Sequence, residues 1–198
     1  CRKHFKICKP LFSINKWFKV YSSDTIKRLK KFKELRTDAY QICITGDARN
    51  IDIFESVKNL SEKKNFYKLL KKQKISGIFT SPPYIGLIDY HEQHAYAYDL
   101  FKIGRNDNLE IGSLSKGQSA TAKLSYIEDI AKVLNNAKKY MKDDYNVFIV
   151  ANDKYDLYTK IAELSGMKIV NKFKRPVLNR VEKDKSAYSE IIFHLKEL

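Results

Sequence analysis

The chain has 198 residues, which suffice for one domain with a sizeable core but would crowd two complete domains. Hydrophobic residues make up 43% of the chain and aromatic residues 13%, so a disordered or fibrous protein is excluded. No apolar run approaches the roughly 20 residues that span a bilayer, and no signal-peptide pattern opens the chain. We therefore expect a cytoplasmic protein with no membrane partner.

Lysine and arginine number 38 against 23 acidic residues, which gives a formal net charge of +15. Such an excess attracts polyanions and raises the rate of encounter with nucleic acid. An AT-rich genome, which favours lysine codons, produces the same composition without that function. The charge thus favours a nucleic-acid partner and leaves the compositional explanation open.

The cysteines are sparse and odd in number, which argues against a disulfide framework. Cys1, His4 and Cys8 are close together in the sequence but have no clear fourth ligand, so we expect no metal centre. Cys43 lies in an apolar run and is expected to be a small buried side chain.

The first expected element is a basic helix within residues 1–38. Ser23 and Asp24 are good N-cap residues, and apolar residues follow them at helical spacing. The lysine-rich run 27–33 fits the solvated side of that helix, and Trp17 is expected to pack in a core. Residues 1–38 therefore form a separate helical segment in this prediction.

Two strands are predicted next. Residues 40–45 form a short β-branched run that stops at a glycine, and residues 75–80 form an apolar run that ends at two prolines, which cannot donate to a ladder. A lysine-rich helix lies between them. Residues 85–120 hold four glycines among polar and aromatic residues, as a long loop region does. Three aromatic residues there share helical spacing and are expected in the core: Tyr96, Tyr98 and Phe101.

The last third of the chain has a clearer pattern. Apolar residues line one face of a helix over 124–141, and a second helix covers 155–165. Strands are expected at 146–151, 167–174 and 188–195. Because strands alternate with amphipathic helices, the sequence predicts an α/β domain around a mostly parallel sheet.

The segment most informative about function is Thr80–Tyr84, at the carboxyl end of a predicted strand, where open α/β sheets bind ligands. Its prolines leave a rigid stretch of carbonyl acceptors, Ser81 adds a hydroxyl, and Tyr84 adds a flat aromatic face. These groups suit an exocyclic amino group, because they accept its two N–H donors while a ring stacks alongside. An amino group held in this way directs its lone pair at an electrophilic methyl group. A plain structural turn is the alternative interpretation.

Ser-Pro-Pro-Tyr after a hydrophobic strand resembles the catalytic motif of the DNA amino-methyltransferases, which methylate cytosine N4 or adenine N6 with S-adenosylmethionine. The serine form is commoner among the cytosine-N4 enzymes. The resemblance covers roughly residues 40–195 and includes Ile44–Arg49 and Asp89–His91. It implies a partial Rossmann-like methyltransferase domain over 39–198, with strands three to seven of the family fold and an antiparallel last strand. It also implies a duplex DNA partner with the target base flipped out of the stack.

The resemblance assigns site residues one by one, and each has a structural alternative. Asp47 could simply end a strand in a turn, and the cationic residues could simply be solvated. Catalysis is assigned to Ser81, Pro82, Pro83 and Tyr84; cofactor binding to Asp47, Ala48 and Thr80; and DNA binding to His91, His94, Lys116, Arg175 and Arg180.

One departure from the family pattern concerns the cofactor. The family has a glycine-rich loop after its first strand, whereas no two of the seven glycines here lie within three residues of each other. We therefore expect the first two strands and that loop to come from a second chain or from a missing N-terminal part of a longer gene product. The isolated chain should then bind S-adenosylmethionine poorly.

The leading hypothesis is a site-specific DNA methyltransferase acting on cytosine N4 in a restriction-modification setting. Adenine N6 methylation is the alternative within the same chemistry. A catalytically incomplete DNA-binding or interaction subunit, and an RNA or protein amino-methyltransferase with a related motif, remain as alternatives of other classes.

Overall fold

The computed structural model describes residues 13–60, 64–176 and 189–198. The chain divides into two compact units, Cys1–Cys43 and Ile44–Leu198. Four residues considered above lie outside the described ranges: Cys1, His4, Cys8 and Arg180.

The described part of the first unit contains one long helix, α1 (Ile14–Leu35). The Ser13 hydroxyl caps it by accepting the backbone N–H of Lys16 at 3.3 Å. The predicted start at Ser23 and Asp24 is therefore wrong, because both residues lie inside the helix. No residue of α1 is buried, so the expectation that Trp17 packs in a core is also wrong.

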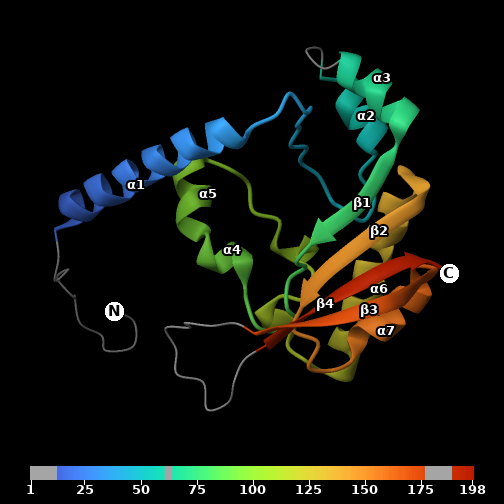
Figure 1. Cartoon of the computed structure of the whole chain (residues 1–198). Coiled ribbons are helices and arrows are strands. Elements are labelled where there is room, and N and C mark those ends of the chain that lie inside the picture. Colours follow the sequence, from blue (N-terminus) through green and yellow to red (C-terminus); the bar gives the residue numbers. More distant parts are fainter. Residues whose placement is uncertain (1–12, 61–63, 177–188) are drawn as a thin grey trace. The chain divides into compact units, whose positions relative to one another are not determined.

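The second unit is built on a four-stranded sheet with the order β1-β2-β4-β3 (Figure 1). β1 pairs with β2 in parallel, and β4 pairs antiparallel with both β2 and β3. Three strands therefore run in one direction and the C-terminal strand runs against them. This confirms the predicted α/β fold with a mostly parallel sheet and an antiparallel last strand. The strands are β1 (Ile75–Thr80), β2 (Met141–Ala151), β3 (Met167–Pro176) and β4 (Ser189–Glu197).

Two helices, α6 (Ala120–Lys138) and α7 (Leu157–Leu164), pack against the sheet and form the core with it. The helices carry apolar residues at helical spacing, and β2 and β4 alternate buried and less buried residues over 145–149 and 192–196, so one face of these elements turns to the core. β3 is mostly exposed after Met167. Two further helices, α2 (Ile53–Lys58) and α3 (Lys64–Gln73), precede β1. Core residues include Tyr126, Ile130, Leu134, Val147, Ile149, Tyr158, Ile161, Phe193 and Leu195.

Residues 40–45 do not form the predicted strand and have no regular secondary structure. A strand needs a neighbour for its ladder, and in the doubly wound order 3-2-1-4-5-6 the third strand pairs only with the second. The described residues provide no such second strand. Cys43, in the same segment, is exposed instead of buried.

Residues 85–120 are more ordered than the predicted long loop. They contain two short α-helices and two 3-10 turns. Elements this short leave no clear periodic pattern in a sequence with many glycines, so the sequence does not predict them. Tyr96 and Phe101 are exposed, so their predicted core packing is wrong. The four elements are α4 (Tyr90–Gln93), α5 (Ala95–Phe101), η2 (Asp107–Leu109) and η3 (Leu114–Lys116).

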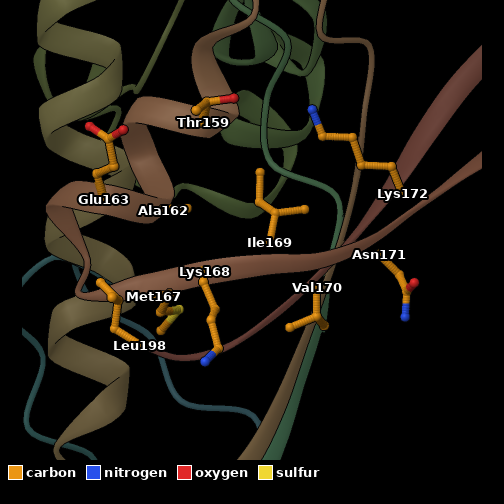
Figure 2. Close-up of a pocket in the computed structure, with 10 residues that line it drawn as sticks. All are labelled: Thr159, Ala162, Glu163, Met167, Lys168, Ile169, Val170, Asn171, Lys172 and Leu198. Carbon is orange, nitrogen blue, oxygen red and sulfur yellow. The ribbon is translucent and has the colours of Figure 1, made fainter.

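A cavity of about 460 Å³ lies between α7 and β3 (Figure 2). Thr159 and Glu163 line it from the helix, and Ile169 and Lys172 line it from the strand. β3 and β1 are the two opposite edge strands of the sheet, so this cavity is remote from the segment that follows β1. None of the helices described is long and apolar enough to span a membrane. Within the described ranges, no cluster of His, Cys, Asp or Glu side chains could hold a metal ion.

Candidate active site

The Ser81–Tyr84 motif follows β1 directly, at the carboxyl end of that strand, as the sequence predicts. Thr80, the last residue of β1, lies beside Ile149 of the parallel neighbour β2. The motif therefore stands at the sheet edge where the carboxyl ends of two parallel strands meet, which is the usual ligand site of open α/β sheets.

A pair of buried tyrosines holds the motif from the core side. The Tyr126 hydroxyl, on α6, donates to the Pro83 carbonyl at 2.9 Å and lies 2.8 Å from the Tyr158 hydroxyl, on α7. A phenol has one hydroxyl hydrogen. Because Tyr126 donates its hydroxyl hydrogen to the Pro83 carbonyl, the Tyr158 hydroxyl must donate to Tyr126. Burial raises the pKa of Tyr126 to about 12 and raises that of Tyr158 further, so both phenols stay neutral. The result is a directed chain from Tyr158 through Tyr126 to Pro83.

Tyr158, the first donor of this series of hydrogen bonds, is held in place by the segment that follows β2. The Asp153 carboxylate accepts the backbone N–H groups of Leu157 at 2.7 Å and Tyr158 at 3.3 Å. It thereby caps the first turn of α7 and fixes the helix that carries Tyr158. Burial raises the pKa of Asp153, and the two N–H bonds oppose that shift.

The last residue of the motif is tied to the C-terminal strand. The Tyr84 hydroxyl donates to Glu190 Oε1 at 2.6 Å, and Glu190 Oε2 pairs with Arg175 at 3.2 Å. Glu190 lies on β4 and Arg175 lies opposite it on β3. The aromatic side chain assigned to base stacking is thus held by one carboxylate, and a guanidinium compensates the charge of that carboxylate.

The turn after the motif is held by the segment that precedes α6. Gly86 has φ 61°, in the left-handed region, and a Cβ there would lie 2.8 Å from the Gly117 carbonyl oxygen. Its N–H donates to the Gly112 carbonyl at 2.8 Å, and the Leu114 N–H donates to Ile88 O at 3.0 Å. The motif is therefore followed by a turn that only glycine fits.

Asp47 is engaged by a neighbouring arginine. Arg49 donates to both oxygens of Asp47, at 2.7 Å from Nη2 to Oδ2 and 2.9 Å from Nε to Oδ1. It also donates to Asp129 on α6 at 3.1 Å and to the Leu109 carbonyl at 3.3 Å. The hydrogen bonds that Arg49 donates to the Asp47 carboxylate lower the pKa of Asp47, since they stabilise its charged form. Arg49 thus connects the turn at residues 46–50 to α6 and to η2.

A cleft of about 340 Å³ brings together Asp47, Ala48 and His91, which the sequence had assigned to two different ligands. The Nδ1 atom of His91 is buried and has no hydrogen-bond partner among the described residues. The nearest carboxylate oxygen, Asp107 Oδ1, is 3.9 Å away, too far for a hydrogen bond. The cleft is lined by Thr45, Gly46, Asp47, Ala48, His91, Asn106, Leu109, Glu110 and Ile111.

The remaining predicted residues lie elsewhere. Thr80 does not line this cleft, and His94 is exposed at the end of α4. The Lys116 ammonium donates to the Glu110 carbonyl, and Arg175 is paired with Glu190. Sequence reasoning missed five residues that hold the site together, because their role depends on partners 32 to 106 positions away: Arg49, Tyr126, Asp129, Tyr158 and Glu190.

Comparison with known proteins bears on the family of the chain. No family model matches the chain. A Type II methyltransferase of Methanocaldococcus jannaschii, M.MjaII, is 53% identical over 196 residues, which cover 99% of this chain and 36% of that relative. A solved structure from Thermoplasma acidophilum, described as a candidate methyltransferase, covers 63% of this chain and 69% of its own with 13% identity. Its TM-score of 0.27 supports no conclusion. The chain thus spans about a third of the length of that archaeal relative, and their 53% identity over nearly all of this chain supports a DNA methyltransferase family assignment.

Proposed function

We propose that this protein transfers a methyl group from S-adenosylmethionine to the exocyclic amino group of a base flipped out of duplex DNA. Cytosine N4 is the proposed target, because the motif begins with serine, and restriction-modification is the proposed setting. The 53% identity to the Type II methyltransferase M.MjaII supports the chemistry. The strong positive charge, +15, supports a nucleic-acid partner.

The observation that carries the proposal is the division of acceptors within the motif. The Pro83 carbonyl is occupied by Tyr126. Among the described residues, no hydrogen bond engages the Ser81 hydroxyl or the Pro82 carbonyl. Two acceptors therefore remain at the carboxyl end of β1, which matches the two N–H donors of an exocyclic amine. Accepting both hydrogens favours a pyramidal nitrogen, whose lone pair is free to attack.

The cleft beside Asp47 suits the nucleoside part of the cofactor. It is concave and partly apolar, and one of its lining residues is His91, whose buried Nδ1 has no hydrogen-bond partner among the residues that the structure describes. Ala48 and Ile111 supply apolar lining, and Asp47 is held in place by Arg49. The cofactor, when bound, supplies an electrophilic methyl group. The residues of this cleft would bind and orient its nucleoside part.

The direct test uses the native protein that contains this sequence, tritiated S-adenosylmethionine and lambda DNA from a methylation-deficient host. Mass spectrometry of the nucleosides should find N4-methylcytosine. N6-methyladenine would change the target base and keep the reaction class, whereas the absence of any methylated base would refute the proposal. Ser81→Ala should lower kcat more than KM, because its hydrogen bond strengthens in the transition state. Thr159→Ala, at the remote cavity, is the control that should leave kcat unchanged.

A DNA-binding subunit without catalysis is the second candidate, and one observation favours it. The Asp47 carboxylate accepts four hydrogen bonds from Arg49, one of them from its backbone, so it has little capacity left for a cofactor amino group. Calorimetry with S-adenosylmethionine separates the two candidates. A subunit of this kind would bind lambda DNA and no cofactor.

A further inference from the structure

The contact between Tyr84 and Glu190 joins the motif to a residue 106 positions away. Glu190 is only 14% exposed, and each of its two oxygens has a different partner: Tyr84 at 2.6 Å and Arg175 at 3.2 Å. Arg175 itself is 56% exposed. A nearly buried carboxylate is costly unless its oxygens are paired, so this arrangement is held only while both partners are present.

Packing alone does not require this carboxylate. An apolar residue at position 190 would suit the same face of the strand, because Ile192, two residues further along β4, is apolar and partly buried on that face. What the carboxylate adds is a fixed point for the far end of the Tyr84 ring. A hydrogen bond at the hydroxyl of a tyrosine fixes the position of the oxygen and so restricts χ1. Because a phenolic O–H prefers to lie in the plane of its ring, a fixed acceptor also favours one ring plane, which is set by χ2.

We propose that Glu190, held by Arg175, is a positioning residue that fixes the plane of the Tyr84 ring for stacking on the target base. The inference rests on the proposed methyl transfer to a flipped base. It also gives Arg175 a role different from the phosphate contact expected from the sequence, because Arg175 acts through Glu190.

Kinetics of methyl transfer should show the role as a loss in turnover. Glu190→Ala and Tyr84→Phe each remove the hydrogen bond and should lower kcat roughly tenfold or more, with a smaller change in KM for DNA. The double variant should lose no more kcat than the worse single variant, since both substitutions remove the same hydrogen bond. Glu190→Gln keeps a carbonyl acceptor and should recover most of kcat, a rescue that a purely structural role would not require.

The same strand provides a matched control. At the other end of β4, Glu197 accepts the Tyr145 hydroxyl and pairs with Lys138 at 2.9 Å, so it repeats the tyrosine–carboxylate–cation arrangement away from the motif. Glu197→Ala and Tyr145→Phe should change thermal stability without changing kcat. If these controls lowered kcat as much as Glu190→Ala, the effect would be one of stability and the inference would fail.

The experiment measures tritium transfer to unmethylated lambda DNA by the native protein and each variant, with melting temperatures recorded in parallel. A wild-type protein that methylates DNA, with Glu190→Ala and Tyr84→Phe equally active, would overturn the inference and leave the proposed function intact. A wild-type protein that methylates no DNA would overturn the proposed function and the inference with it. Arg175→Gln adds a second criterion. The slope of log K for DNA binding against log salt should be the same for this variant as for wild type. Loss of a phosphate contact would instead reduce that slope by about one.

Discussion

Replacing Tyr126 with phenylalanine tests the buried tyrosine chain most sharply. The side chain is 3% exposed, and its hydroxyl both donates to Pro83 and accepts from Tyr158. Phenylalanine fills nearly the same volume, so no cavity term arises. What remains is one half-buried carbonyl, that of Pro83, and one buried hydroxyl, that of Tyr158, each without its partner.

The magnitude follows from those two orphaned groups. A buried unsatisfied polar group costs about 1–3 kcal/mol and a half-buried one costs less, so Tyr126→Phe should lower the free energy of unfolding by about 2–4 kcal/mol. Tyr158→Phe removes one hydrogen bond and leaves Pro83 satisfied, so it should cost about 0.5–1.5 kcal/mol. The double variant should cost less than the sum, because Tyr158 is then no longer left as an orphaned donor.

Urea denaturation followed by circular dichroism measures these free energies, provided the slope with urea is unchanged among the variants. The order Tyr126→Phe worse than Tyr158→Phe is the essential result. Equal costs for the two variants, or a strictly additive double variant, would refute the directed chain from Tyr158 through Tyr126 to Pro83.

Three further predictions concern the charged and titrating groups of the site. Because the folded-state pKa of Tyr126 is raised to about 12, the folded state holds that proton more tightly than the unfolded state does. Tyr126 should therefore contribute no loss of stability below pH 10 and about 1.4 kcal/mol per pH unit from pH 10 to 12, and Tyr145 and Tyr158, whose pKa values are also raised, should add to that loss. Urea titration at each pH should show that Tyr126→Phe reduces the slope by about 1.4 kcal/mol per pH unit. Arg49→Lys should lower the free energy of unfolding by about 1–3 kcal/mol in thermal or urea melts, since a lysine cannot bridge Asp47, Asp129 and the Leu109 carbonyl together. A variant as stable as wild type would contradict the bridging role. His91→Ala should weaken S-adenosylmethionine binding in calorimetry while His94→Ala does not, and the opposite pattern would remove His91 from the cofactor cleft.

Local sequence signals predicted most of the second unit. Gly166, with φ 62°, ends α7 as its position at the end of an apolar helical pattern indicates. The two prolines after β1 mark the motif because they cannot continue a ladder. The prediction of a strand at 40–45 is wrong because a strand needs a neighbouring strand, and local propensity does not show whether that neighbour exists.

The site was only half predictable for a related reason. The motif and the cleft residues Asp47 and Ala48 stand out as local patterns. Tyr126 and Glu190 do not, because a tyrosine on an amphipathic helix and a glutamate at a strand start have many ordinary explanations. Only the pairing of distant segments shows that their oxygens meet the motif.

The strand order carries a consequence for how the protein is made. β4 is the last strand along the chain, yet it lies between β2 and β3. During synthesis β3 emerges first and has no neighbour in the sheet until β4 follows it, and Tyr84 waits for Glu190 in the same way. The motif at residues 81–84 therefore leaves the ribosome about a hundred residues before its anchor, so the site matures only after β4 has inserted. A nascent chain stalled before residue 189 should carry the whole motif and still be sensitive to proteolysis at the carboxyl end of β1.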